Sequence, residues 1–267
     1  MLHVCLQDDA YNPYIRDLGK THSVATLLTK NRQAADDDEA IKIISSADAI
    51  FFAGGDQWTY LQEWEGTALQ KTVQKLIQEH NIPVGGTSAG CDIQGGEIYT
   101  AANGTVVSKE ALRDPYNFRV TLQPFPFINH TAGLIANAII DTHFITRDRM
   151  GRLVAFIARL WHDEGIHAFG IGIDEQTAIA IDSEGKGTMM KQGHYGGRAF
   201  VLTPTHTPSR CSPGEDLQFE GVVVQKLIAD NKDKYDFVAM KGGASSQRYN
   251  LSARDGKLHP SDPYSPP

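Results

Sequence analysis

Two short apolar runs, each ending in glycines, constrain the fold of this chain more than any other feature. Ala47 to Ala53 is followed by Gly54-Gly55, and Ile82-Pro83-Val84 is followed by a second glycine-rich turn. Between them, from Thr67 to His80, apolar residues recur at helical spacing on one face. A strand, a helix and a strand within about forty residues are typical of a parallel βαβ unit. The sequence therefore predicts an α/β fold.

The second half of the chain continues this pattern and then changes. An amphipathic helix is predicted from Leu153 to Trp161, and strands are predicted at 168–173 and 178–181. The polar turn Asp182 to Gly185 follows the second strand and predicts a β-hairpin added towards the C-terminus. Because no repeat or linker is visible, we expect residues 1 to 258 to form a single domain. The polar, proline-rich residues 259 to 267 are predicted to be a disordered tail.

Charge and cysteine usage exclude several classes of partner. The formal charge is −7 and the pI is near 5.8, which argues against nucleic acid or an anionic membrane as a partner. No apolar window is long enough to cross a bilayer. Three isolated cysteines, Cys5, Cys91 and Cys211, suit a reducing compartment better than a disulfide framework. No signal peptide is visible at the start, so a cytoplasmic location is expected, although a truncated N-terminus could hide one.

The second glycine turn contains a candidate nucleophile. Gly86-Thr87-Ser88-Ala89-Gly90 has the G-x-S-x-G spacing of a strand-to-helix elbow. A serine hydroxyl needs a base, a group that orients the base, and donors for the oxyanion. The N–H of Ala89 is one expected donor, and the Gly54-Gly55 turn is the candidate for the second.

A histidine and an acid also follow apolar segments. His143 follows the apolar stretch that begins at Leu134, and Glu175 follows the predicted strand that ends at Asp174. Because the chain has ten histidines, spacing alone does not connect these residues with Ser88. A histidine that packs at a strand end and an acid in a solvated turn remain open alternatives.

Four motifs taken in order resemble peptidase family S51, the family of the cyanophycinases and cyanophycinase-like exopeptidases. They are FFAGGDQ, GGTSAG, DTHFITRDRMGRL and GIGIDEQTAIAI. The resemblance implies a three-layer sandwich of the flavodoxin-like, glutamine-amidotransferase-like type, with a mostly parallel sheet and helices on both faces. It implies a catalytic triad of Ser88, His143 and Glu175, and it implies no metal and no organic cofactor.

The same resemblance implies roles for further residues. Gly55 joins Ala89 as an oxyanion donor, and the residues expected to bind substrate are Gln57, Asp141, Thr142, Arg147 and Arg149. Cyanophycinases carry D-Q-H-F, and this chain has Thr142 in place of that glutamine. The implied function is a serine-type exopeptidase or isopeptidase that acts next to Asp in small or β-aspartyl peptides. A homodimer is a further expectation.

The resemblance also implies an apolar strand and a glycine-rich turn at the start of the chain. Neither is visible in residues 1 to 25, so we expect either a truncated chain that lacks the first strand or a divergent one.

Four alternatives to a serine peptidase differ from it in the residues they require. In an α/β-hydrolase the acid precedes the histidine along the chain, whereas here His143 precedes Glu175. A glutamine amidotransferase has a cysteine at the elbow, and Cys91 lies three residues beyond Ser88. The histidines of HDEGIH are five residues apart, so they do not share a helix face as metal ligands would. An inactive relative that binds peptides or serves as an assembly protein is the remaining alternative.

Overall fold

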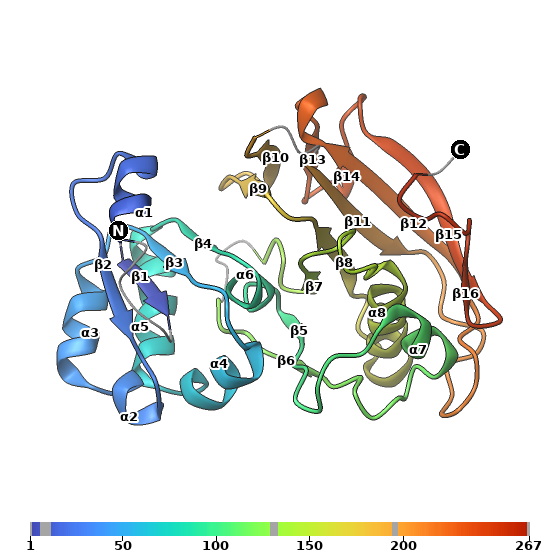
Figure 1. Ribbon diagram of the computed structural model, residues 1–267, viewed down its shortest axis with the longest axis horizontal. Coiled ribbons are helices and arrows are strands. Elements are labelled where there is room, and N and C mark those ends of the chain that lie inside the picture. Colours follow the sequence, from blue (N-terminus) through green and yellow to red (C-terminus); the bar gives the residue numbers. More distant parts are fainter. Residues whose placement is uncertain (1, 6–11, 129–132, 194–196, 266–267) are drawn as a thin grey trace. The chain divides into compact units, whose positions relative to one another are not determined.

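Figure 1 shows a computed structural model of the chain, which describes residues 2–5, 12–128, 133–193 and 197–265. The chain divides into two compact units: Met1–Gly96 with Pro124–Ala136, and Glu97–Gln123 with Asn137–Pro267. The single domain expected from the sequence stays a prediction.

The first unit is built on a four-stranded parallel sheet in the order β2-β1-β3-β4. Its strands are β1 (Leu2–Cys5), β2 (Ala25–Leu28), β3 (Ile50–Phe52) and β4 (Val84–Gly86). The strand pair around the predicted helix is confirmed, since β3 pairs with β4 in parallel. The predicted absence of a first strand was wrong, because Leu2–Cys5 pairs on both sides. The glycine-rich turn expected after it would lie at residues 6–11, outside the described residues.

The helices of the first unit begin where the sequence supplies caps. They are α1 (Asn12–Gly19), α2 (Arg32–Ala35), α3 (Asp38–Ser45), α4 (Gln57–Trp64), α5 (Ala68–His80) and α6 (Ala89–Asp92). The Asp37 side chain accepts hydrogen bonds from the first turn of α3, and Thr67 does the same for α5. Asn81 then ends α5 in the left-handed conformation. The predicted helix up to His80 is confirmed.

An aromatic cluster forms much of the core of the first unit. Trp64 stacks on Tyr60 with ring centroids 4.2 Å apart, and Phe52 and Phe127 pack against Trp64. All four side chains are fully buried. Phe127 belongs to the Pro-Phe-Pro-Phe stretch, so these aromatic residues fill a core rather than project from a surface loop.

The second unit contains two sheets. The larger has the order β16-β15-β12-β11-β8-β7-β5-β6 and the smaller β14-β13-β10-β9. The larger comprises β5 (Glu97–Tyr99), β6 (Leu122–Pro124), β7 (Ala138–Asp141), β8 (Phe169–Ile173), β11 (Arg198–Pro204), β12 (Phe219–Ile228), β15 (Gln247–Arg254) and β16 (Lys257–His259). The smaller comprises β9 (Thr177–Ile181), β10 (Lys186–Lys191), β13 (Lys234–Asp236) and β14 (Lys241–Gly242).

Strand direction in the second unit changes along the larger sheet. Pairing is parallel through β5, β7 and β8, and antiparallel from β8 through β11, β12, β15 and β16. The predicted hairpin is confirmed, because β9 and β10 pair antiparallel around the turn at residues 182–185. The chain is thus a mixed α/β protein with antiparallel hairpins in its C-terminal half.

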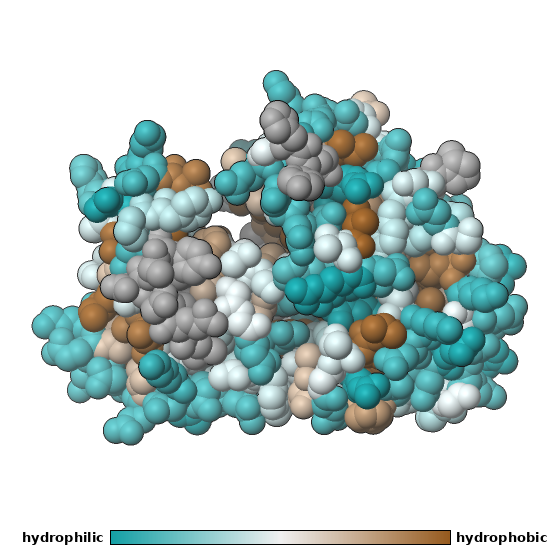
Figure 2. All heavy atoms as spheres, in the orientation of Figure 1, coloured by the Kyte–Doolittle hydropathy of each residue, from teal (hydrophilic) through white to brown (hydrophobic). Residues whose placement is uncertain are grey.

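Helix α8 (Met150–Glu164) packs on β7, β8 and α7 (Ser108–Arg113). Its residues from Met150 to Ala158 are all buried, and all of them except Arg152 are apolar or glycine. A short 3₁₀ turn, η1 (Ala229–Asn231), follows β12. No helix in the described parts of the chain is both long and apolar enough to span a membrane. On the face drawn in Figure 2, hydrophilic residues predominate and hydrophobic ones form small separate groups.

The structure differs from the predicted disordered tail at residues 259–265. The Tyr264 hydroxyl accepts a hydrogen bond from the N–H of Met150 and donates one to Asp148. Its ring packs edge-on against Phe144 and Phe200. Proline and serine content suggested solvent exposure, but one aromatic side chain attaches this segment to the core.

Candidate active site

Ser88 lies in the tight turn between β4 and α6, with φ 52° and ψ −126°. A positive φ is uncommon for a residue with a side chain and costs about 1–3 kcal/mol. The turn is compact: a methyl group on Gly86 would lie 2.1 Å from the Gly90 carbonyl oxygen, and one on Gly90 would lie 2.3 Å from the Phe52 carbonyl oxygen. Both glycines are therefore required sterically, and the elbow predicted from G-x-S-x-G is present.

The Gly54-Gly55 turn lies directly beside Ser88. A methyl group built on Gly54 would come within 3.2 Å of Ser88 Cβ. The Tyr60 hydroxyl holds this turn by a shared hydrogen bond to the carbonyl oxygens of Ala53 and Gly54, at 2.9 and 3.0 Å. Within the described residues, neither the Gly55 nor the Ala89 amide donates a hydrogen bond. Both amides, predicted as oxyanion donors, thus belong to the turns that meet at Ser88.

In the second unit, His143 and Glu175 are brought together. His143 follows β7 and Glu175 follows β8, at the carboxyl ends of two adjacent parallel strands. The His143 Nδ1 and Glu175 Oε1 atoms lie 2.8 Å apart. The two side chains are 23% and 48% exposed, so the pair is accessible to a reactant.

Asp174 holds the loop that carries His143. Its Oδ1 accepts hydrogen bonds from the N–H groups of Ile145 and Thr146 and from the Thr146 hydroxyl, at 3.0–3.2 Å. His143 itself has φ 50°, a conformation that needs such support. No role was predicted for Asp174 from the sequence, although its position directly before Glu175 could have indicated one.

Asp141 and Arg149, both predicted to bind substrate, belong to an ion cluster with Arg152. Asp141 accepts two hydrogen bonds from Arg152, at 2.6 and 2.7 Å, and one from Arg149 at 3.1 Å. Asp141 and Arg152 are each 3% exposed. Arg149 also donates to the Thr142 carbonyl oxygen at 2.8 Å. This ion cluster stiffens the end of β7 that precedes His143.

The pairing of Arg152 with Asp141 was not predicted from the sequence. Arg152 lies one helical turn beyond Arg149, so the two can reach a single carboxylate from the same helix face. That spacing was a usable signal, but neither burial nor the partner is visible in the sequence.

The remaining predicted substrate residues are placed differently from one another. Gln57 is the first residue of α4, directly after the capping residue Asp56. Thr142 is buried, and its hydroxyl has no hydrogen-bond partner among the described residues. Arg147 is exposed, and its backbone N–H donates to the His143 carbonyl oxygen.

The structure gives less support to the two alternative sites, a cysteine nucleophile at Cys91 and a metal site in HDEGIH. Burial, then the Asp92 carboxylate, raises the pKa of the Cys91 thiol, so it is not a thiolate at neutral pH. In HDEGIH, His162 contacts Tyr116 and Asp163, while the His167 ring packs at a tilt against Trp161. In the described parts of the chain, no group of three or more His, Cys, Asp or Glu is arranged to hold a metal ion.

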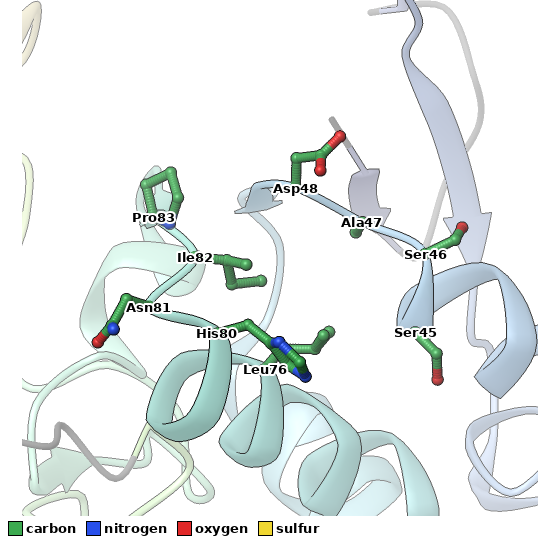
Figure 3. Close-up of a pocket in the computed structure, with 9 residues that line it drawn as sticks. All are labelled: Ser45, Ser46, Ala47, Asp48, Leu76, His80, Asn81, Ile82 and Pro83. Carbon is green, nitrogen blue, oxygen red and sulfur yellow. The ribbon is translucent and has the colours of Figure 1, made fainter.

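A pocket of about 370 Å³ lies at the other end of the first unit's sheet (Figure 3). It is lined by residues that precede β3, such as Asp48, and residues that precede β4, such as Ile82. In a parallel sheet, amino ends lie opposite the carboxyl ends that carry Gly54 and Ser88. The pocket is thus not part of the candidate site.

Comparison with known proteins identifies the family of the chain. The sequence profile described as Peptidase family S51 matches residues 7–188, which is more than half of the chain. A cyanophycinase of Synechococcus elongatus is 30% identical over 183 residues, covering 68% of this chain and 51% of the relative. A cyanophycinase of Geminocystis herdmanii is 26% identical over 187 residues, covering 68% and 62%. The chain thus spans between half and two thirds of the length of these relatives.

A crystal structure of a peptidase from an acI-B1 Actinobacterium aligns with 94% of this chain and 82% of its own, at 15% identity and a TM-score of 0.44. The family is assigned from the sequence profile and not from this structural alignment. The matched range, residues 7–188, includes Ser88, His143 and Glu175. The chain belongs to peptidase family S51.

Proposed function

We propose that this chain is a serine-type peptidase, an exopeptidase or isopeptidase that hydrolyses bonds next to Asp in small or β-aspartyl peptides. The observation that carries the proposal is the 2.8 Å contact between His143 Nδ1 and Glu175 Oε1. It is supported by the strained elbow conformation of Ser88. A base held by a carboxylate, and a serine exposed on a strand-to-helix turn, are the parts that acyl transfer requires.

The proposed mechanism assigns a role to each group. Because Glu175 engages Nδ1 of His143, the neutral imidazole carries its proton there and presents Nε2 as the base. His143 takes the Ser88 proton as the hydroxyl oxygen attacks the carbonyl carbon, and the amides of Gly55 and Ala89 bind the oxyanion. The imidazolium then donates this proton to the amine nitrogen as the C–N bond breaks, which leaves the acyl group on Ser88. In deacylation, His143 takes a proton from water as the water oxygen attacks the acyl carbon, and it then donates that proton to the Ser88 oxygen as the ester bond breaks.

Substrate preference is proposed from charge. Arg147 is exposed beside His143 and is available to pair with a substrate carboxylate. Arg149 is occupied by Asp141 and Thr142, so its proposed role is to support the loop. Gln57 and Thr142 remain proposed pocket residues. The matched relatives are cyanophycinases by name, which makes β-aspartyl peptides the first substrates to test.

The test combines labelling with turnover. A fluorophosphonate probe should label the wild-type protein and the control variant Ser209→Ala, which alters an exposed serine, but not Ser88→Ala. The same three proteins are incubated with α-aspartyl and β-aspartyl dipeptides and with cyanophycin, and products are identified by mass spectrometry. Absence of both labelling and cleavage in folded wild-type protein would refute the proposal in favour of an inactive peptide-binding relative.

The finer fold and the cellular setting are proposed with the function. The parallel order β2-β1-β3-β4 supports a flavodoxin-like, three-layer arrangement, because doubly wound sheets of that type begin with this order. The net charge of −7 supports a protein without nucleic-acid or membrane partners. A cytoplasmic homodimer that needs no metal or organic cofactor completes the proposal.

A further inference from the structure

Strand β9 is an unprotected sheet edge that begins two residues after Glu175. It is five residues long, Thr-Ala-Ile-Ala-Ile, and forms the end of the smaller sheet (Figure 1). Sheet edges are usually protected by charged residues or proline. The edge strands β14 and β16 of the same unit each begin with a lysine, whereas β9 contains no charge and no proline.

The pairing register shows which backbone groups of β9 face outward. Gln192 N–H donates to Gln176 O, and Asp182 N–H donates to Lys186 O, at 3.0 and 3.1 Å. Hydrogen-bonded pairs alternate in an antiparallel ladder, so Ala178 and Ala180 are the residues that bond to β10. The N–H and C=O groups of Thr177, Ile179 and Ile181 therefore point away from β10. No strand in the described parts of the chain pairs with this edge.

The side chains beside this edge are small or apolar and accessible. Ala178 and Ala180 are exposed. Ile181 is 36% exposed, and Met190, which lies opposite Ala178 on β10, is 55% exposed. A chain added at the edge would cover this apolar surface, and the alanines leave room for its side chains.

Charge distinguishes between two molecules that could pair with β9, a second copy of the chain and a peptide. Acidic residues lie at both ends of β9: Glu175 before it, and Asp182 and Glu184 after it. A second copy paired antiparallel about Ile179 would bring Glu175 of one chain close to Asp182 of the other, which is unfavourable. A peptide with basic residues towards its ends would be attracted instead.

We propose that β9 binds the extended part of a peptide substrate as an added antiparallel strand, and that this peptide carries basic residues towards its ends. The inference rests on the proposed function, because β9 leads directly from the Glu175 that holds His143. Main-chain hydrogen bonds supply the affinity in this type of recognition. Peptides longer than a dipeptide are thus the substrates that gain these contacts, and they are cleaved at a residue beyond the paired segment.

Binding tests this directly. The probe is a fluorescein-labelled octapeptide, β-Asp-Lys-Val-Thr-Val-Thr-Val-Lys, and binding is measured by anisotropy with the Ser88→Ala protein as background. Adding Ile181→Pro removes one outward N–H, and its matched control Ile181→Val keeps that group. Loss of one hydrogen bond should weaken octapeptide binding about fivefold, with no effect in the control. In otherwise wild-type protein, turnover of the dipeptide β-Asp-Lys should be unchanged by Ile181→Pro.

A second experiment alters the peptide and leaves β9 unchanged, so it tests strand addition even if Ile181→Pro does not fold. N-methylation of the octapeptide, one residue at a time, should weaken binding at every second residue. Equal binding by the two Ile181 variants together with uniform tolerance of N-methylation would overturn the proposal. So would a wild-type dimer, seen by sedimentation, that Ile181→Pro dissociates. If no peptide is cleaved by wild-type protein, the proposed function fails, while the binding results still decide the role of β9.

Discussion

The ion cluster at the end of β7 makes the strongest prediction about stability. Replacing Arg152 by Met keeps the length of the side chain and removes its charge. Asp141, 3% exposed, would lose its two hydrogen bonds from Arg152 and keep only the one from Arg149. The Arg152 hydrogen bonds to Thr105 and to the Val106 carbonyl oxygen would also be lost.

The expected cost follows from this burial. Removing one partner of a buried ion pair typically costs 3–5 kcal/mol, because an uncompensated charge is left behind. Arg149 still offsets part of the Asp141 charge, so we expect the lower end, about 3 kcal/mol. For a protein of this size, that lowers the melting temperature by roughly 6–12 °C.

The assay is urea unfolding followed by circular dichroism, with Arg147→Met as the control. Arg147 is exposed and close to Arg152 in sequence, so its replacement should change the free energy of unfolding by less than about 0.5 kcal/mol. Asp141→Asn and the double variant complete a cycle, in which the two changes should be strongly non-additive. A loss below about 1 kcal/mol for Arg152→Met, or additive effects, would refute a structural role for this cluster.

Three further predictions concern the catalytic pair, the elbow and a buried carboxyl. Glu175→Gln should lower kcat by about two to four orders of magnitude with little change in KM, because the amide no longer selects the His143 tautomer; an unchanged kcat in steady-state assays would argue against the triad. Gly90→Ala should unfold or strongly destabilise the protein in thermal melts, because its methyl group would lie 2.3 Å from a backbone oxygen. Gly104→Ala meets no atom within 4 Å and should cost only about 1 kcal/mol, from its positive φ; equal effects at the two glycines would contradict this. Burial raises the pKa of the Glu97 carboxyl in the folded state above its ordinary value. The contribution of Glu97 to the free energy of unfolding is therefore fully present below the ordinary pKa and is lost as pH rises through the raised pKa of the folded state. Unfolding titrations should show that loss in the wild type and not in Glu97→Gln.

The candidate catalytic residues were predictable because each lies at a recognisable local boundary. Ser88 follows a short apolar strand in a glycine turn, and His143 and Glu175 each come shortly after a strand. Parallel strands bring such boundaries to one sheet edge, so adjacency of His143 and Glu175 follows from the order of β7 and β8. Spacing alone did not connect them with Ser88, and the resemblance to a family did.

The roles of the arginines were less predictable. Arg147 and Arg149 are two residues apart in one motif, yet one is exposed and the other is bound to Asp141. A charged residue near an active-site histidine can face either a substrate or a buried counter-ion. Only the direction of α8, which places Arg152 beside Asp141, distinguishes the two cases.

The sequence by itself determined the local elements: the amphipathic helices, the glycine elbow and the hairpin formed by β9 and β10. These depend on interactions between residues close along the chain, so periodicity and turn chemistry are sufficient to predict them. Tertiary structure decided that Leu2–Cys5 is a strand, that Tyr264 holds the end of the chain, and that Asp141 is buried between two arginines. Each of these depends on partners that are distant in sequence or on the packing around a buried charge, and neither the partners nor the burial can be read from the residues themselves.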